Sequence, residues 1–446
     1  MRIAPTARLC CTTPSTAQTT PRDEMLMAYR RLMLPGATKA RVISRTNGPR
    51  RHLATAVEVW KEINALGARP GAINMGQGFP DFAGSKVARE SAAAALLSGD
   101  AALNQYSPPP GLQDLRDAVS EFYARTYPGG RPYDPSSEVV VCTSGQEALN
   151  ASMRAVLQRT EAGGRNGVLV FEPFFPFTMP PLTNAGGVMQ PVKLHAPTFA
   201  IDPAAVEAAI TPQTGAIVLN TPHNPTGHVA SRGELEAIAQ LCVKHDLLAI
   251  SDEVYEHSVF GAGCEHLRLA DFPGMRERTI TVSSAGKLFS LTGWRVAWAL
   301  ACPELALAVA TAHTNLTYSA PTPLQAGIAA ALKVEDGSFG GVRELFGGNF
   351  ELLADALQCH GGLQVCDAQG GYFLVADTQG IPDMEYVRAL ADATGVVCTP
   401  MSVFYKSELQ QPCTLVRFTI CKSREHITRA CKALQGAGAA SVRTGP

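Results

Sequence analysis

The chain has 446 residues, of which 46% are hydrophobic and 17% are charged. This composition excludes a disordered or fibrous protein, and the length is enough for two or three domains around a large core. The formal net charge is −1, but residues 1–52 hold ten Lys and Arg residues against two acidic ones, while the remainder holds 28 basic and 37 acidic residues. Because the remainder is mildly acidic, we expect no nucleic-acid partner.

The first 52 residues differ from the rest of the chain in composition. They are rich in Arg, contain ten Ser and Thr residues and are poor in acidic residues, which is typical of a transit peptide. We therefore expect an organellar protein, in a mitochondrion or a chloroplast. The alternative is a basic tail with no targeting role on a cytoplasmic protein.

The sequence indicates neither a membrane span nor a metal site. No apolar run reaches the ~18–20 residues that a spanning helix needs. The twelve cysteines form no Cys-x-x-Cys pair and have no histidine at zinc spacing. We therefore expect reduced, mostly buried thiols and no bound metal.

Short apolar runs without strict alternation recur from residue 138 onward, and such runs are typical of strands covered on both faces. The runs are 138–142, 168–171, 216–220, 247–251, 279–283 and 296–301. Helical patterns separate several of them, at 146–158, 231–245 and 304–317. The alternation predicts βαβ units and a largely parallel sheet in an α/β domain over residues 81–335.

The pattern changes after Gly337, where strands become fewer and are mixed with helices. We expect a smaller α+β domain over residues 336–446. Its expected elements are helices at 342–359 and 384–393, strands at 372–376 and 415–421, and a closing helix from 424. Residues 53–80 are expected to pack on this domain as an N-terminal arm.

In open α/β sheets, ligands bind beyond the carboxyl ends of the strands. Polar or aromatic residues follow five of the expected strands. They are Ser144, Gly145 and Gln146, then Phe175, then Asn224, then Asp252 and Tyr255, and finally Ser284, Lys287 and Arg295. Each alone fits a turn, a helix cap, a core residue or a surface lysine. Together they supply an anion site, a stacking face, a carboxylate, a phenol, an amide and an amine, which are the groups needed to hold pyridoxal phosphate and form a Schiff base.

Several motifs, in order along the chain, carry a resemblance to a known family. They are MGQGFPDF at 75–82, NQY at 104–106, EPFF at 172–175, HNPTG at 223–227, SDEVY at 251–255, SSAGKLFSLTGWRVAW at 283–298 and LVRF at 415–418. Over about residues 60–435 the chain resembles the class I, fold-type I aminotransferases. It is most similar to the branch of kynurenine aminotransferase, also called glutamine transaminase K or cysteine-conjugate β-lyase.

The resemblance implies a large pyridoxal-phosphate domain, with a mostly parallel seven-stranded sheet between helices, and a smaller α+β domain. It implies that Lys287 forms the Schiff base and moves the substrate proton, and that Asp252 pairs with the pyridinium nitrogen. Tyr255 and Asn224 would reach the ring oxygen, and Phe175 would stack on the ring. The phosphate would be held by Ser144, Gly145, Gln146, Ser284 and Arg295.

The substrate and the partner subunit are also implied by the resemblance. Arg417 matches the arginine that binds the substrate α-carboxylate, and Gly76 would let its backbone approach the substrate. Tyr106 matches a tyrosine that reaches the phosphate of the neighbouring subunit's cofactor, so we expect a homodimer with shared active sites.

The expected reaction is a ping-pong transfer of an amino group from an amino acid to a 2-oxo acid. We expect large neutral or aromatic donors of the kynurenine or glutamine type, because Phe79, Phe175, Tyr106 and Tyr318 would form an apolar wall. Aspartate or methionine aminotransferase and cysteine-conjugate β-lyase are the alternatives, and a cofactor-binding protein without turnover is a further one. The donor stays open, because Tyr318-Ser319-Ala320 and the turn at 144–147 differ from the pattern of the kynurenine branch.

Overall fold

The structure is a computed structural model that describes residues 49–334, 339–359, 362–406 and 412–443. Residues 1–48 of the expected leader therefore lie outside the described residues, and the transit peptide stays a prediction. The first described helix, α2 (Pro49–Gly67), begins inside the last residues that we assigned to the leader.

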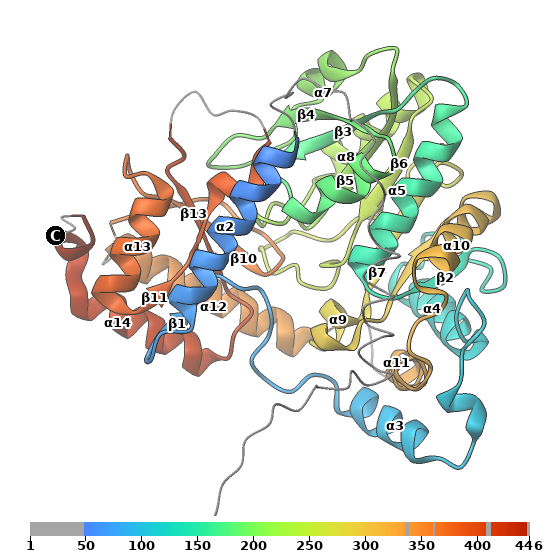
Figure 1. Ribbon diagram of the computed structural model, residues 1–446, viewed down its shortest axis with the longest axis horizontal. Coiled ribbons are helices and arrows are strands. Elements are labelled where there is room, and N and C mark those ends of the chain that lie inside the picture. Colours follow the sequence, from blue (N-terminus) through green and yellow to red (C-terminus); the bar gives the residue numbers. More distant parts are fainter. Residues whose placement is uncertain (1–48, 335–338, 360–361, 407–411, 444–446) are drawn as a thin grey trace, which may run out of the picture. The chain divides into compact units, whose positions relative to one another are not determined.

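Within the described residues, a central sheet has seven strands in the order β2-β8-β7-β6-β5-β3-β4 (Figure 1). They are β2 (Val139–Cys142), β3 (Gly167–Glu172), β4 (Val188–Lys193), β5 (Thr214–Asn220), β6 (Leu248–Asp252), β7 (Thr279–Ser284) and β8 (Ala297–Leu300). Strand β8 is antiparallel to both of its neighbours, and the other pairs are parallel. The predicted mostly parallel sheet is confirmed.

Helices cover both faces of this sheet (Figure 1). The helices of this part of the chain are α3 (Lys86–Leu97), α4 (Gln113–Thr126), α5 (Gly145–Glu161), α6 (Met179–Asn184), α7 (Pro203–Ala209), α8 (Arg232–Lys244), α9 (Ala285–Leu288), α10 (Pro303–Thr317) and α11 (Thr322–Val334). Of these, α3 packs on α11 and not on the sheet. Successive strand residues point to opposite faces. Val140 and Cys142 join the core with α5 and α10, whereas Val139 and Val141 join the core with α4 and α11. This burial on both sides explains the uninterrupted apolar runs.

Strand β4 was not predicted from the sequence. It lies at an edge of the sheet, where Met189 and Val192 alone among its six residues are buried, and Val188 is half exposed. Pro191 lies in its middle, and proline is tolerated in edge strands because one side of the strand has no hydrogen-bonding partner.

A second, smaller sheet lies in the C-terminal part of the chain, in the order β12-β13-β10-β9 with antiparallel pairing. Its strands are β9 (Gln364–Val365), β10 (Phe373–Asp377), β12 (Thr399–Pro400) and β13 (Leu415–Thr419), and its helices are α12 (Gly340–Cys359), α13 (Asp383–Thr394) and α14 (Arg424–Arg443). Strand β1 (Ile73–Asn74) pairs in parallel with β11 (Val396–Val397). The domain boundary at residue 336 stays a prediction.

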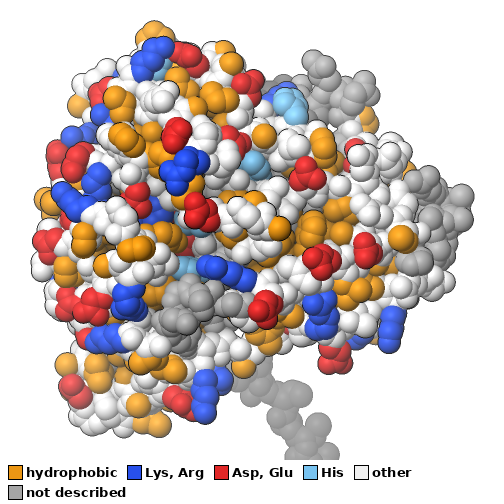
Figure 2. Space-filling view, turned by 180° about the vertical axis from the view of Figure 1, so that it is seen from behind, with side chains coloured by type: hydrophobic (Ala, Val, Ile, Leu, Met, Phe, Trp, Pro, Cys, Tyr) orange, Lys and Arg blue, Asp and Glu red, His pale blue; other side chains and the backbone are white. Residues whose placement is uncertain are grey.

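The surface and the helices add two facts about the described residues. On the face drawn in Figure 2, acidic and basic side chains are intermixed. Among the described helices, none combines the length and the apolar character that crossing a membrane requires.

The packing of α11 on α3 gives a testable prediction of stability. A Cβ atom on Gly327 would lie 2.6 Å from the Ala88 carbonyl oxygen and 2.8 Å from the Ala92 Cβ. We expect Gly327→Ala to lower the free energy of unfolding by about 1–3 kcal/mol, because the helices would have to separate. The matched control is Gly233→Ala in α8, where nothing lies within 4 Å of the added carbon. The control should keep or raise the thermal midpoint, and an equal loss in both variants would contradict the prediction.

Candidate active site

The carboxyl ends of β5, β6 and β7 meet at one edge of the central sheet. The register pairs Asn220, the last residue of β5, with Asp252, the last residue of β6. Ser284 ends the neighbouring strand β7. The Asn220 side-chain amide donates to the Asp252 carbonyl oxygen at 2.9 Å and accepts from the Asn224 N–H at 2.7 Å. These bonds fix the loop after β5 beside the end of β6.

A cavity of about 630 Å³ opens at this edge and is lined by most of the predicted site residues. The predicted residues that line it are Gly145, Gln146, Phe175, Asn224, Asp252, Tyr255, Ser284, Lys287, Arg295 and Arg417. Residues that the prediction omitted line it as well, namely Trp60, Asn64, Gln77, Gly78, Leu149, Phe177, Asn220, Val254 and Phe373. The chain therefore brings one amine, one carboxyl group and two guanidinium groups into a single cavity.

Lys287 lies on the short helix α9, which follows β7 directly. Its Nζ donates to the Gly78 carbonyl oxygen at 3.3 Å and lies 4.8 Å from the ring centre of Tyr372. Burial lowers the pKa of Lys287 to about 8, and the Arg295 and Arg417 charges act in the same direction. The neutral amine, which a nucleophile or a general base requires, is therefore more populated near neutral pH than for an exposed lysine.

Asp252 is almost completely buried at the end of β6. Its Oδ1 accepts a long hydrogen bond of 3.4 Å from the Val254 N–H. Burial raises the pKa of Asp252 to about 7, while the Val254 N–H and the Lys287 charge oppose the rise. A cation placed beside such a buried carboxyl group would strongly stabilise its charged form.

The turn between β2 and α5 has the local geometry of an anion site. Ser144 has a φ of 94°, and its side chain caps α5 by accepting from the Glu147 N–H. Gly145 follows, and a Cβ there would lie 3.3 Å from Val254 Cγ1. The N–H groups at the start of a helix favour an anion. Arg295, with a φ of 57°, donates to the Thr292 carbonyl oxygen at 2.9 Å and contributes a cation to the same cavity.

Arg417 reaches the cavity from β13 and is only 4% exposed. Its two terminal nitrogens donate to Asn224 Oδ1 at 2.8 Å and to the Gly76 carbonyl oxygen at 3.0 Å. The guanidinium carbon lies 3.8 Å from the ring centre of Phe373. Burial lowers the pKa of Arg417 to about 9. A buried, oriented guanidinium group of this kind is suited to bind a carboxylate at two points.

Gly76 is not among the residues that line the cavity, and its predicted contact with the substrate stays a prediction. Its carbonyl oxygen instead accepts hydrogen bonds from Arg417 and from Thr399 Oγ1. A Cβ on Gly76 would lie 2.9 Å from Thr399 Oγ1. A glycine is required here because the backbone of Gly76 lies close to Thr399 in β12.

Within one chain, the structure brings only part of the predicted apolar wall to the cavity. Phe79 and Phe175 line the cavity, but Tyr106 and Tyr318 do not. Tyr106 and Tyr318 meet edge to face with ring centres 5.2 Å apart, and Tyr106 is 81% exposed. The two tyrosines lie away from the cavity because Tyr106 follows a separate short turn, and Tyr318 follows α10, whose core side packs under the sheet.

Trp60, Phe177 and Phe373 supply the missing part of the wall. Trp60 lies on α2, one helical turn before Asn64, so these two side chains share a helix face. Their role depends on the packing of distant segments, and no local signal in the sequence indicated it. Asn220 could have been found, since it ends a predicted strand in the same way as Asp252.

A larger hollow of about 1080 Å³ shares no lining residue with this cavity. It lies along α8 and the end of α4, and its lining includes Tyr127, Arg232, His266 and Phe272. Its lysine, Lys244, is engaged by Glu207 at the surface. The smaller cavity is the better candidate for catalysis, because the strand ends and the amine with a lowered pKa converge there.

Comparison with known proteins agrees with this geometry. The profile of the aminotransferase class I and II family matches residues 70–434. The probable N-succinyldiaminopimelate aminotransferase of Mycobacterium tuberculosis is 40% identical over 391 residues, covering 85% of this chain and 96% of that protein. Its solved structure superposes with a TM-score of 0.80 at 38% identity and covers 87% of this chain and 99% of that chain.

Two other relatives carry different names. Human kynurenine–oxoglutarate transaminase 1 is 33% identical over 378 residues, covering 78% of this chain and 87% of that protein. The methionine aminotransferase of Escherichia coli K12 is 31% identical over 382 residues, covering 84% of this chain and 95% of that protein. The protein therefore belongs to the class I and II aminotransferases and is a fold-type I transaminase that depends on pyridoxal phosphate.

Proposed function

We propose that this aminotransferase takes the amino group of a large neutral amino acid, of the kynurenine or glutamine type, and passes it to a 2-oxo acid in two half-reactions. The observation that carries the proposal is the cavity wall, where the rings of Trp60, Phe79 and Phe177 stand beside two neutral amides. Gln77 Nε2 donates to Asn64 Oδ1 at 2.7 Å. Such a wall accepts an apolar side chain that ends in a carbonyl or an amide.

The cations of the cavity support a neutral side chain on the donor. Among the described residues that line it, the cationic side chains are Lys287, Arg295 and Arg417. Arg417 is proposed to bind the α-carboxylate, because each terminal nitrogen has a second N–H beyond the one held by Asn224 or Gly76. Arg295 is proposed to bind the phosphate, and Lys287 carries the reactive amine. This assignment leaves no described cation for a second carboxylate.

The residues of the cavity fit pyridoxal phosphate. Asp252 is a buried carboxyl group, and a protonated pyridine nitrogen beside it would favour its charged form. Gly145 and Ser284 stand at the start of α5 and the end of β7, where the phosphate would meet backbone N–H groups and Arg295. Phe175 lines the cavity as a face for the ring. When bound, the cofactor supplies an aldehyde carbon and a ring that accepts the electrons of the broken Cα–H bond.

The proposed task of Lys287 is to take the proton from the substrate Cα and deliver it to the cofactor carbon that carried the aldehyde. A neutral amine is needed for the first step, and the burial that lowers the pKa of Lys287 to about 8 provides it. The carbonyl oxygen of Gly78 orients the amine. Arg417 is proposed to hold the α-carboxylate, which is bonded to Cα, and so to restrict the orientation of the Cα–H bond relative to the lysine.

A second candidate function is the transfer of an amino group from an N-succinylated diamino acid. The 40% identity with the Mycobacterium tuberculosis protein, which is named for that substrate, favours it. Such a donor carries distal carboxylates, which a cation would have to meet. The neutral wall described above favours the first candidate.

We also propose a homodimer in which each active site uses residues of both subunits. Tyr106 and Tyr318 form an exposed aromatic pair, and Tyr106 borders a hollow of about 570 Å³. Thr143, next to the phosphate turn, lines the same hollow. The exposure of Tyr106 supports the proposal that it reaches the cofactor phosphate of a second copy.

The donor is tested by following the first half-reaction alone. Kynurenine, glutamine, methionine, aspartate and N-succinyl-LL-diaminopimelate are each added to the holoenzyme, and the loss of the visible absorbance of the lysine-bound cofactor is recorded. We expect kynurenine or glutamine to exceed aspartate by about 100-fold or more in rate over affinity, because an unpaired carboxylate in the neutral wall costs several kcal/mol. A preference for the succinylated donor would establish the second candidate. The control Lys287→Ala should show no half-reaction.

The pKa of Lys287 is tested on the apoenzyme. We expect the rate at which added pyridoxal phosphate becomes trapped on Lys287 by borohydride to rise with pH through about 8 and then level off, since only the neutral amine attacks. Arg417→Met should move the midpoint to higher pH, because the Arg417 charge lowers the pKa of Lys287. The control Arg388→Met breaks only a surface ion pair with Glu62 and should not move it. An unchanged midpoint in Arg417→Met would refute the electrostatic coupling.

The shared active site is tested with mixed dimers. Tyr106→Ala and Lys287→Ala proteins are each measured alone and then after joint unfolding and refolding at equal amounts. In a mixed dimer one site combines an intact Lys287 with an intact Tyr106, so we expect recovery toward about a quarter of wild-type activity. If the mixture shows only the average of its two components, Tyr106 acts within its own subunit or not at all.

A further inference from the structure

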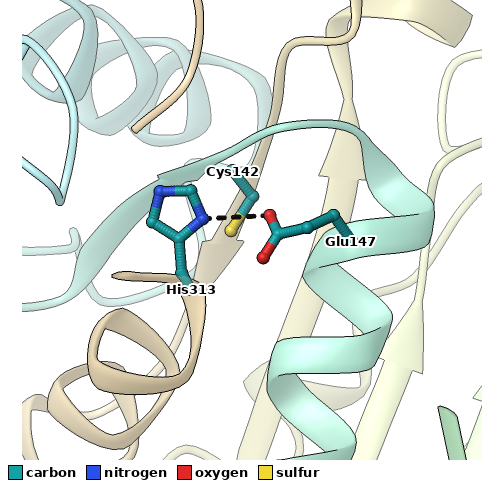
Figure 3. A group of neighbouring side chains, drawn as sticks. All are labelled: Cys142, Glu147 and His313. Atoms are coloured by element: carbon teal, nitrogen blue, oxygen red, sulfur yellow. Dashed lines mark hydrogen bonds and ion pairs between the residues drawn. The ribbon is translucent and has the colours of Figure 1, made fainter. Parts of the chain in front are cut away.

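A buried group of side chains lies directly beneath the proposed phosphate turn. Cys142 ends β2, Glu147 lies in the first turn of α5, and His313 projects from α10, as Figure 3 shows. His313 Nδ1 and Glu147 Oε2 are 3.0 Å apart. His313 is fully buried and the Glu147 side chain is 10% exposed. The aminotransferase chemistry described above uses none of these side chains.

Glu147 forms two hydrogen bonds to the turn that precedes it. Its Oε2 also accepts from the Thr143 N–H at 2.9 Å, while the Glu147 N–H donates to Ser144 Oγ at 3.3 Å. The pattern resembles a capping box, in which the glutamate side chain accepts from the N–H of the N-cap residue. Here it accepts from the N–H of Thr143, one residue before the N-cap Ser144. The side chain and the backbone of Glu147 therefore together constrain the turn from Thr143 to Gly145.

Thr317, the last residue of α10, extends the contact to the other side of the turn. Its Oγ1 lies 3.2 Å from His313 Nδ1 and accepts from Thr143 Oγ1 at 3.2 Å. The next residue, Tyr318, has a φ of 69°, and Ser144 has a φ of 94°. Two residues other than glycine thus adopt positive φ on either side of the same hydrogen bonds. Such conformations persist only where the surroundings fix them.

We propose that Glu147 and His313 are positioning residues that hold the turn Thr143–Gly145 in the conformation that binds the cofactor phosphate. The proposal rests on the proposed role of that turn in phosphate binding. Neither residue lines the cavity, so both act through Thr143 and Ser144. Their carboxylate and imidazole atoms set the direction of the N–H groups at the start of α5.

The same three side chains could also be considered as a metal site, since one ligand atom of each lies within 4.8 Å of the others. The hydrogen bonds favour the positioning role. Burial, followed by the Glu147 carboxylate, raises the pKa of Cys142, which keeps its thiol protonated, whereas a metal binds the thiolate. The Glu147 oxygen nearest to the imidazole is already occupied by the Thr143 N–H.

The expected effect is on the affinity for phosphate. Glu147→Leu leaves the Thr143 N–H without its acceptor, and His313→Leu removes the donor that orients the carboxylate. We expect each to raise the dissociation constant of pyridoxal phosphate about 10-fold or more. Removing the groups that orient the ligands of a bound metal has an effect of this size on metal affinity. Glu147→Gln keeps an oxygen acceptor and His313→Asn keeps a donor near the position of Nδ1, so both should recover most of the affinity.

The test uses the full chain, freed of cofactor and then titrated with pyridoxal phosphate and, separately, with inorganic phosphate followed by the shift of the thermal midpoint. Asp202→Ala serves as the control for general destabilisation, because it removes the N-cap of α7 (Ala204 N–H to Asp202 Oδ1, 2.9 Å) far along the chain. The control should lower the thermal midpoint and leave the dissociation constant unchanged. Thr317→Val, which removes only one hydroxyl group, keeps the test available should a leucine variant not fold.

The outcomes separate this proposal from the function on which it rests. Unchanged affinity for both phosphates in folded Glu147→Leu, or in Thr317→Val where the leucine variants do not fold, would overturn it. So would stoichiometric metal in the purified wild-type protein that His313→Leu abolishes. If borohydride traps no cofactor on wild-type Lys287, the proposed function fails instead. Trapping on Lys287 together with a raised dissociation constant that Glu147→Gln restores would support both.

Discussion

The position of one buried carboxyl group, Asp252, sets the geometry of the whole site. It ends a central strand, and the parallel register on either side places Asn220 on one flank and Val282, two residues before the end of β7, on the other. The loop that carries Asn224 and the helix that carries Lys287 start from these two strand ends. Moving β6 by one residue would turn Asp252 to the opposite face of the sheet, because side chains alternate along a strand. The apolar interior of the sheet therefore fixes the chemistry at its edge.

The cavity holds more positive than negative side chains, and burial disfavours the charged forms of the positive ones. The pKa values of Lys287 and Arg417 are lowered to about 8 and about 9, which shows how strongly the site disfavours its own cations. A phosphate beside Arg295 and a carboxylate beside Arg417 would offset the cost of burying these cations. Binding of the two anions is thus favoured by the same charges that keep the Lys287 amine reactive.

Much of this arrangement could be predicted from the sequence, and the failures have physical causes. The inner strands form continuous apolar runs because helices cover both of their faces, whereas β4 is an edge strand with two buried residues and was missed. Groups that directly follow a strand, such as Asp252 and Lys287, were placed correctly in the cavity. Trp60 and Asn64 were missed because their position depends on how α2 packs against distant segments. Tyr318 was misplaced because the sequence does not reveal the positive φ that ends α10.

The segment from Gly76 to Asp81 has an unequal set of attachments. Arg417 and Lys422 hold it through the carbonyl oxygens of Gly76 and Phe79, and Ser423 donates to Asp81, all from the C-terminal part of the chain. On the other side, Lys287 holds it through the Gly78 carbonyl oxygen. Once the lysine amine is engaged in catalysis, that link is gone. The bonds to Arg417, Lys422 and Ser423 remain, and they tie Phe79 of the cavity wall to the C-terminal part of the chain. The state of the Lys287 amine therefore sets whether this part of the wall is also attached to the central sheet.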